Sequence, residues 1–150
     1  MKIEDALKSR LIKDDFQKLY INIAFTSIWL EEQLNKLFKD IGITSHQYNV
    51  LRILRGSLGT PLPACDIQGR MIYKNSNVTR IIEKLVSKEL TSKKSNEKNR
   101  RKIEVEITPA GLDLLAQLDM KVMQVHHNLF KNITVEEAQS FNNLLDKIRG

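Results

Sequence analysis

The 150-residue chain has the length of one domain and is too short for two comfortable ones. Its composition, 41% hydrophobic and 28% charged, is typical of a folded globular protein and excludes an intrinsically disordered one. No apolar run approaches the length of a membrane span, and the first residues lack the apolar stretch of a signal peptide. The single cysteine, Cys65, excludes an internal disulfide framework, so the expected location is the cytoplasm.

The net charge of +6 is concentrated in one part of the chain. Residues 70–108 hold 11 Lys and Arg against 5 Asp and Glu, whereas the rest holds 13 of each sign. Localised positive charge on an otherwise balanced protein favours a surface that binds a polyanion. The competing interpretation is a solvated face, which is what most charge runs form.

The first long helix is expected over about residues 14–41, where Gly42 ends it. Apolar residues recur there at spacings of three and four, the pattern of an amphipathic helix. A shorter helical arm is expected within residues 2–12. Thr44 and Gln47 have the spacing of a capping box, which predicts a second helix that reaches the break at residues 56–59.

Two short helices joined by a turn follow. The first comes after Pro61 and Pro63 and is expected to bury Ile67 and Met71. The second covers NSNVTRIIEKLVSKEL, residues 75–90, with Asn75 or Ser76 as its cap. Its core face is expected to consist of Val78, Ile81, Ile82 and Leu85. Polar and cationic residues on the opposite face predict a helix-turn-helix whose second helix is exposed.

A β-hairpin is expected next, from residues 90–94 and 101–107 with residues 95–100 as its polar tip. Alternation predicts that Ile103, Val105 and Ile107 face the core, while Glu104 and Glu106 face water. A helix-turn-helix followed by a basic hairpin is a winged helix-turn-helix. The predicted fold is therefore mainly α, with a small β-hairpin wing.

The last third is predicted to be helical again. Thr108 is the expected cap of a helix whose first position is Pro109, and Thr134 begins a final helix. The final helix carries apolar residues on one side, at Ala138, Phe141, Leu144, Leu145 and Ile148. Long amphipathic helices at both ends have no obvious partner within one small domain. They predict a homodimer, whose two-fold symmetry would place two heads on two half-sites.

The stretches SNVTRIIEKL, KEL and NRRKIEVEITPAGLDLL resemble the DNA-reading head of the MarR family of transcriptional regulators, and the helix order agrees from about Phe16 to Ile148. The resemblance implies a single domain in which residues 14–41 and 109–150 are dimerisation helices and residues 44–108 form the head. It also implies a bacterial repressor that binds pseudo-palindromic operators on double-stranded DNA. A small phenolic or aromatic ligand often releases such regulators, so a ligand of this class is a further expectation.

The exposed helix face and the resemblance together indicate the DNA-binding residues. In the recognition helix they are Asn75, Ser76, Asn77, Thr79, Arg80 and Lys84. In the wing they are Lys98, Asn99, Arg100, Arg101 and Lys102. Forked Asn and Arg groups suit base edges, whereas Ser and Thr also hold phosphates. The resemblance assigns Arg101 to the minor groove. Asn99 stands where the family has an acidic residue, and Glu89 stands where a glycine often ends the recognition helix, so a left-handed backbone is expected there.

Several other residues could have a functional role or a purely structural one. Cys65 is either a small packed residue, which is favoured, or an oxidant sensor. Trp29 and Tyr20 either belong to the core or line a ligand cavity near the dimer base. His126 and His127 lie beside one another, point apart on a helix, and lack partners at metal-ligand spacing, so no metal or cofactor is expected.

No pairing of nucleophile and base, no glycine-rich phosphate loop and no paired carboxylates are present, so an enzyme is not expected. The leading hypothesis is a dimeric, sequence-specific DNA-binding regulator. The alternative is a winged-helix module that docks an acidic protein partner through the basic wing. Affinity for duplex DNA that falls steeply with salt would favour the first.

Overall fold

The computed structural model describes residues 1–8, 14–95 and 103–150. Its elements in chain order are α1 (Ile3–Leu7), α2 (Asp15–Ile41), α3 (Ser45–Gly56), β1 (Leu62–Pro63), α4 (Ala64–Arg70), α5 (Val78–Ser87), β2 (Thr91–Ser95), β3 (Ile103–Ile107), α6 (Pro109–Leu129) and α7 (Val135–Arg149). The fold is mainly α with a small β element, as predicted. Within the described residues, no helix combines the length and the hydropathy that crossing a bilayer requires.

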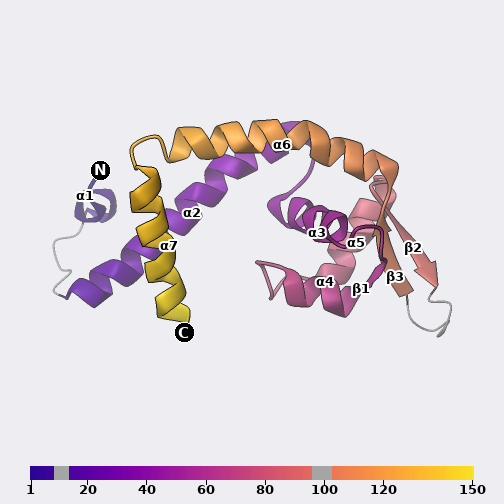
Figure 1. Cartoon of the computed structure of the whole chain (residues 1–150), viewed down its shortest axis with the longest axis horizontal. Coiled ribbons are helices and arrows are strands. Elements are labelled where there is room, and N and C mark those ends of the chain that lie inside the picture. Colours follow the sequence, from indigo (N-terminus) through magenta and orange to yellow (C-terminus); the bar gives the residue numbers. More distant parts are fainter. Residues whose placement is uncertain (9–13, 96–102) are drawn as a thin grey trace.

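The molecule is elongated, with a compact part at one end and an open helical part at the other (Figure 1). Helices α3, α4 and α5 and the three strands form the compact part, which we call the head. Helix α6 extends from the head to the far end of the molecule, and α7 then turns back beside α2. Both chain ends therefore lie in the open helical part, away from the head (Figure 1).

The helix boundaries follow from local capping. Asp14 accepts a hydrogen bond from the Gln17 N–H at 2.8 Å, and Gly42 ends α2 with a φ of 77°, a conformation that favours glycine. Thr44 and Gln47 form the predicted capping box at 3.2 and 3.0 Å. Thr108 and Thr134 cap α6 and α7 as expected, with Pro109 at the first position of α6.

The sheet has three antiparallel strands in the order β1-β3-β2, rather than the two that the sequence predicts. Leu62 of β1 pairs with Val105, which pairs with Lys93 of β2 on its other side. Strand β1 has only two residues, one of them Pro63, so it has no alternation from which to predict it. The extra strand fixes the base of the hairpin to the segment that precedes α4.

The core of the head lies where α3, α4, α5, α6 and the sheet meet. Its buried members include Val50, Leu51, Leu54, Ile67, Ile82, Leu85, Val105 and Leu115. Gly111 lets α6 approach this core, because a Cβ there would lie 2.3 Å from the Leu90 carbonyl oxygen. A second cluster, with Phe38, Ile43, Leu118 and Val122 as its buried members, joins α2 and α6 to the start of α3.

At the end of the molecule far from the head, α2 and α7 expose large apolar side chains. Helix α7 has no buried residue, and Phe141, Leu144 and Ile148 are 51%, 57% and 59% exposed. Phe16 and Tyr20 of α2 are 81% and 74% exposed. The predicted apolar stripes of the end helices therefore exist, but the described chain does not cover them.

Candidate nucleic-acid interface

The helix-turn-helix consists of α4 and α5, joined by residues 71–77. Met71 anchors the turn in the core of the head, where it is 2% exposed. The Ile72 N–H donates to the Asn49 side-chain oxygen of α3 at 3.0 Å, and the Gln68 amide donates to the Lys74 carbonyl at 3.1 Å. These polar contacts hold a turn that has no regular secondary structure. They fix where α5 begins relative to α3 and α4.

Helix α5 separates its side chains by face. Val78, Ile82 and Leu85 are buried, whereas Arg80 and Lys84 are exposed. Asn77 caps the helix, because its side-chain oxygen accepts from the Arg80 N–H at 3.1 Å. The expectation that Asn75 or Ser76 is the cap was therefore wrong, and the helix begins later than either would place it. Asn75, Ser76 and Asn77 precede α5 and lie in the approach to its first turn.

A groove of about 350 Å³ separates the start of α5 from the first turn of α3. Its lining residues are Thr44, His46, Gln47, Ser76, Asn77, Arg80, Ile81 and Lys84. Four of the predicted recognition residues therefore lie beside α3, an element that the sequence did not indicate as part of the site. The capping box predicts where α3 begins, but it does not indicate which element that end faces.

The described part of the wing is β2 and β3. The Lys94 ammonium lies 2.6 Å from the Glu106 carboxylate, which also accepts from Ser92 at 3.2 Å. The hydrogen bond from Lys94 lowers the pKa of Glu106. The expectation that Glu106 faces water was thus wrong, because it is half-buried and paired across the strands. Ile103, predicted to face the core, is 56% exposed, since it lies beyond the reach of the head core.

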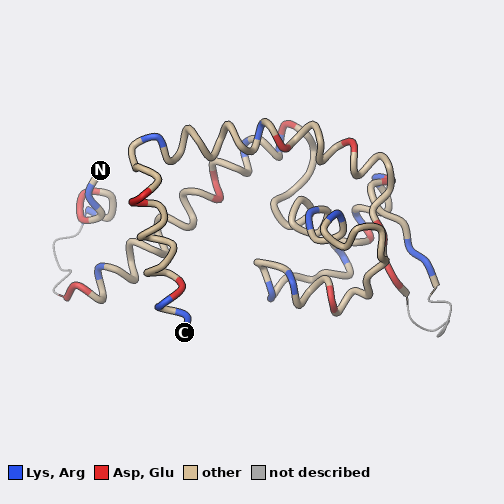
Figure 2. The backbone as a smooth tube through the Cα atoms, in the orientation of Figure 1, with Lys and Arg blue, Asp and Glu red and all other residues tan. Residues whose placement is uncertain are grey.

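Lys and Arg residues are distributed over the head and the described part of the wing (Figure 2). Lys93 and Lys94 are exposed on β2, and Arg70 and Lys74 are exposed at the end of α4 and in the turn. The predicted wing residues Lys98, Asn99, Arg100, Arg101 and Lys102 lie outside the described residues. The residues that flank them belong to β2 and β3, so the chain enters and leaves this segment on the sheet.

The arrangement agrees with comparisons to known proteins. The family model described as the MarR family matches residues 43–103, from the start of α3 to the start of β3. The multiple antibiotic resistance protein MarR of Escherichia coli (strain K12) is 27% identical over 117 residues, which cover 77% of this chain and 79% of that protein. Residues 43–103 thus match the MarR family, and the chain as a whole resembles a member of it. A solved MarR transcription factor from Planctomyces limnophilus, 26% identical, covers 90% of this chain and 98% of its own with a TM-score of 0.71.

Two solved structures of DNA-binding proteins share the fold of this chain. A variant of E. coli MarR complexed with operator DNA superposes with a TM-score of 0.76 at 23% identity, covering 91% of this chain and 99% of that one. BpsR of Bordetella bronchiseptica, whose DNA binding is regulated by 6-hydroxynicotinic acid, gives a TM-score of 0.77 at 20% identity, covering 89% and 99%. In both comparisons the match extends well beyond the head. The predicted winged helix-turn-helix is confirmed.

At two positions where the MarR family often has glycine, this chain has a larger residue, Ile72 or Glu89. Glu89, which replaces a glycine, has a φ of 59°, so the left-handed backbone expected there is confirmed. Its carbonyl accepts from the Thr108 hydroxyl at 2.7 Å, which ties the end of α5 to the start of α6. Ile72, where a glycine often makes the turn, keeps a negative φ and leaves its side chain 80% exposed.

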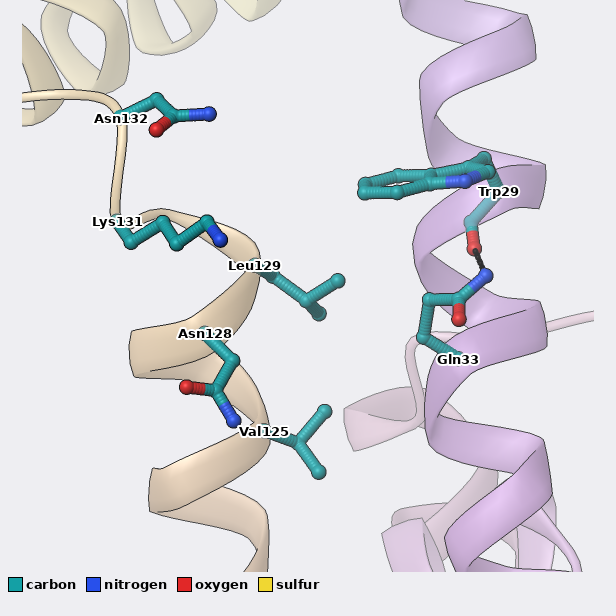
Figure 3. Close-up of a pocket in the computed structure, with 7 residues that line it drawn as sticks. All are labelled: Trp29, Gln33, Val125, Asn128, Leu129, Lys131 and Asn132. Carbon is teal, nitrogen blue, oxygen red and sulfur yellow. Dashed lines mark hydrogen bonds between the residues drawn. The ribbon is translucent and has the colours of Figure 1, made fainter.

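A separate cavity of about 420 Å³ lies between α2 and the end of α6 (Figure 3). The indole of Trp29 faces Val125 and Leu129 across it, and Lys131 also lines it. The Trp29 backbone oxygen accepts a hydrogen bond from the Gln33 amide at 3.4 Å. Trp29 is 41% exposed in the single chain, so it is not simply a core residue.

The remaining candidates from the sequence are the Cys65 thiol and a metal site. Cys65 is exposed, with its Sγ 3.5 Å from an Asp66 carboxylate oxygen, so the prediction of a packed thiol was wrong. It occupies the second position of a short helix whose buried face is provided by Ile67. Within the part of the chain that the structure describes, no three His, Cys, Asp or Glu residues gather as a metal site would require.

Proposed function

We propose that this MarR-family regulator is a homodimeric repressor that binds pseudo-palindromic double-stranded DNA through α5 and the wing. The observation that carries the proposal is the division of α5 into a buried apolar face and an exposed face with Thr79, Arg80 and Lys84. A helix held in this way can enter a major groove without unpacking the head. The surplus positive charge of residues 70–108 supports the same assignment.

The residue roles follow from chemistry and position. Arg80 is the candidate for a bidentate contact with guanine, and the Asn77 amide group can still donate while its oxygen caps α5. Asn75, Ser76, Thr79 and Lys84 would hold phosphates and adjacent bases. Lys98, Asn99, Arg100, Arg101 and Lys102 would carry the wing to the phosphates and the minor groove.

The dimer would form through α2, α6 and α7, that is, residues 14–41 and 109–150, with residues 44–108 as the DNA-binding part. Support comes from a groove of about 400 Å³ between α2 and α7, whose apolar lining includes Leu19, Ile23, Phe141 and Leu144. A second copy of the chain would cover this surface. Leaving so many large apolar side chains in water is otherwise unfavourable.

A small aromatic acid is the proposed effector. The Trp29 indole offers a ring to stack on, and Lys131 offers a charge for a carboxylate at the same cavity. Because Trp29 is the single tryptophan, its fluorescence reports binding directly. Titration with 6-hydroxynicotinic acid, the compound that regulates BpsR, should quench this fluorescence and weaken DNA binding. Lys131→Gln should weaken the response, whereas Lys121→Gln on the exposed surface of α6 should not.

The function is tested by selecting duplexes from a random pool and by footprinting the intergenic DNA beside the gene. We expect an inverted repeat, protected on two half-sites, whose occupancy lowers transcription from an overlapping promoter. Retention of all duplexes alike, with no selected sequence, would refute the proposal. That result would favour a winged-helix module that binds an acidic protein.

A further inference from the structure

The two long strands of the wing carry as many negative charges as positive ones. Strand β2 holds Lys93 and Lys94, and its neighbour β3 holds Glu104 and Glu106 (Figure 2). The sequence between the strands, residues 96–102, contains four Lys and Arg against one Glu. Within the wing, the surplus positive charge therefore belongs to this connecting sequence and not to the strands.

Glu106 and Lys94 form an ion pair that compensates one of the positive charges of β2. Ser92 lies directly opposite Glu106 in the antiparallel register, and Lys94 lies diagonally from it on the same face of the sheet. The Lys94 ammonium is 2.6 Å from a Glu106 carboxylate oxygen, and the Ser92 hydroxyl donates to the same oxygen at 3.2 Å. The hydrogen bond from Lys94 lowers the pKa of Glu106, so the carboxylate is charged at neutral pH.

A free lysine at this place in the wing could neutralise a DNA phosphate. The Lys94 side chain is 57% exposed, against 26% for Glu106, and it is next to the last residue of β2. Cationic side chains add affinity for DNA of any sequence, because each phosphate that they neutralise releases counterions. A lysine that a carboxylate already neutralises adds less, since the phosphate must compete with the carboxylate. Its neighbour Lys93, on the opposite face of the strand, forms no ion pair with the residues that the structure describes.

We propose that Glu106 is a specificity-determining residue that withholds Lys94 from DNA phosphates and thereby lowers the affinity of the wing for DNA of random sequence. This inference rests on the proposed function, in which the wing contacts DNA. Binding to random DNA comes almost entirely from phosphate contacts, and the head is free to shift until its lysines find them. On the operator, base contacts from α5 fix the position of the head, so Lys94 cannot seek a phosphate in the same way. The ion pair therefore weakens random binding more than operator binding.

The test measures binding to the selected operator and to a random duplex of equal length over a range of salt concentrations. Glu106→Gln removes the negative charge but keeps the shape of the side chain and an oxygen that accepts from Ser92 and Lys94. The double variant Glu106→Gln/Lys94→Gln removes both charges, so it has the net charge of the wild type. Asp66→Asn, at an exposed position of α4, removes one negative charge elsewhere in the head and is the control for net charge alone.

We expect Glu106→Gln to bind the random duplex about fivefold more tightly at about 0.1 M salt, with a salt dependence that is steeper by about one unit for each wing that contacts DNA. Its affinity for the operator should rise by less than about twofold, so that its discrimination between the two duplexes falls. The double variant should return to the wild-type values, since no lysine is released. Asp66→Asn should change the salt slope much less than Glu106→Gln does.

Three results would overturn the inference. If Glu106→Gln matches Asp66→Asn, only the net charge of the head matters, and if the double variant binds random DNA as tightly as Glu106→Gln, the released charge is not that of Lys94. If Glu106→Gln binds both duplexes more weakly while its unfolding in urea is unchanged, the pair assists DNA binding rather than restraining it. A wild type that selects no operator would refute the proposed function, and this inference with it. That failure is distinct, because the other three require a wild type that discriminates between the duplexes.

Discussion

Arg55 of α3 binds both carboxylate oxygens of Asp119 of α6, at 2.8 and 3.0 Å. The planar guanidinium meets the carboxylate in the fork geometry that gives the strongest ion pairs at a protein surface. The hydrogen bond from Arg55 lowers the pKa of Asp119. The pair therefore joins the head to the helix that connects it with the far end, and its strength depends on pH.

Asp119→Asn tests this pair. A carboxyl group whose folded-state pKa is lowered stabilises the protein above its unfolded pKa, and the stabilisation disappears as the pH falls through the folded value. Because the pair is partly exposed, the variant should lose at most about 1 kcal/mol of unfolding free energy at pH 7. Urea denaturation should show the same loss at pH 5 and a shrinking loss below about pH 4. Asp113→Asn, an exposed position on α6, is the control, and a loss for Asp119→Asn that persists unchanged at pH 3.5 would contradict the account.

Gly111→Ala tests the close approach of α6 to the sheet. The new Cβ would lie 2.3 Å from the Leu90 carbonyl oxygen and 2.7 Å from Ile107 Cγ1, so backbone must move. We expect a loss of about 1–3 kcal/mol in unfolding free energy, as for overpacked cores. Gly69→Ala is the matched control, because nothing lies within 4 Å of its added Cβ. It should be neutral or stabilising by about 0.5–1 kcal/mol, since alanine favours helix. Equal effects of the two changes would show that α6 does not depend on this close approach.

Leu144→Arg tests the proposed dimer. Leu144 is 57% exposed in the single chain, so a charge there should leave the fold of one chain intact. If a second copy covers the groove between α2 and α7, the variant should become monomeric and lose most operator affinity, because a buried unpaired charge is costly. Gln139→Arg on the opposite side of α7 provides the control. Light scattering that shows a dimer for Leu144→Arg at the wild-type stability would remove α7 from the interface.

Arg101→Ala tests the wing. An arginine that contacts phosphate and the minor groove adds affinity for any duplex, because the minor groove distinguishes little beyond A·T from G·C. We expect weaker binding to operator and random duplex alike, and a salt dependence that is shallower by about one unit for each phosphate that the variant no longer neutralises. The readout is fluorescence anisotropy over a range of salt concentrations. An unchanged salt slope would show that the wing does not reach the DNA.

The features that could be predicted from the sequence are those that depend on residues close together in the chain. The capping box of Thr44 and Gln47, the Thr108–Pro109 helix start and the left-handed Glu89 each depend on a few neighbouring residues, and each is confirmed. Strand β1 was missed because two residues carry no period. The Asn77 cap was missed because Asn75 and Ser76 are equally good caps on propensity alone.

Contacts between segments that lie far apart in the sequence could not be predicted. Exposure of Cys65 and of Ile103 depends on which neighbouring element covers them, and no local pattern contains that information. The same holds for Tyr73, whose ring stacks on His46 of α3. The candidate groove likewise joins α5 to the start of α3, whose part in the site only the tertiary structure reveals.

The most direct measurement compares Arg80→Ala with the wild type on the selected operator and on a random duplex of equal length. If Arg80 makes a bidentate base contact from α5, the variant should lose about 1–3 kcal/mol on the operator and much less on the random duplex. The footprint should keep its position but weaken at the bases that α5 covers. Equal losses on both duplexes, or none on the operator, would contradict the claim that α5 reads the DNA sequence.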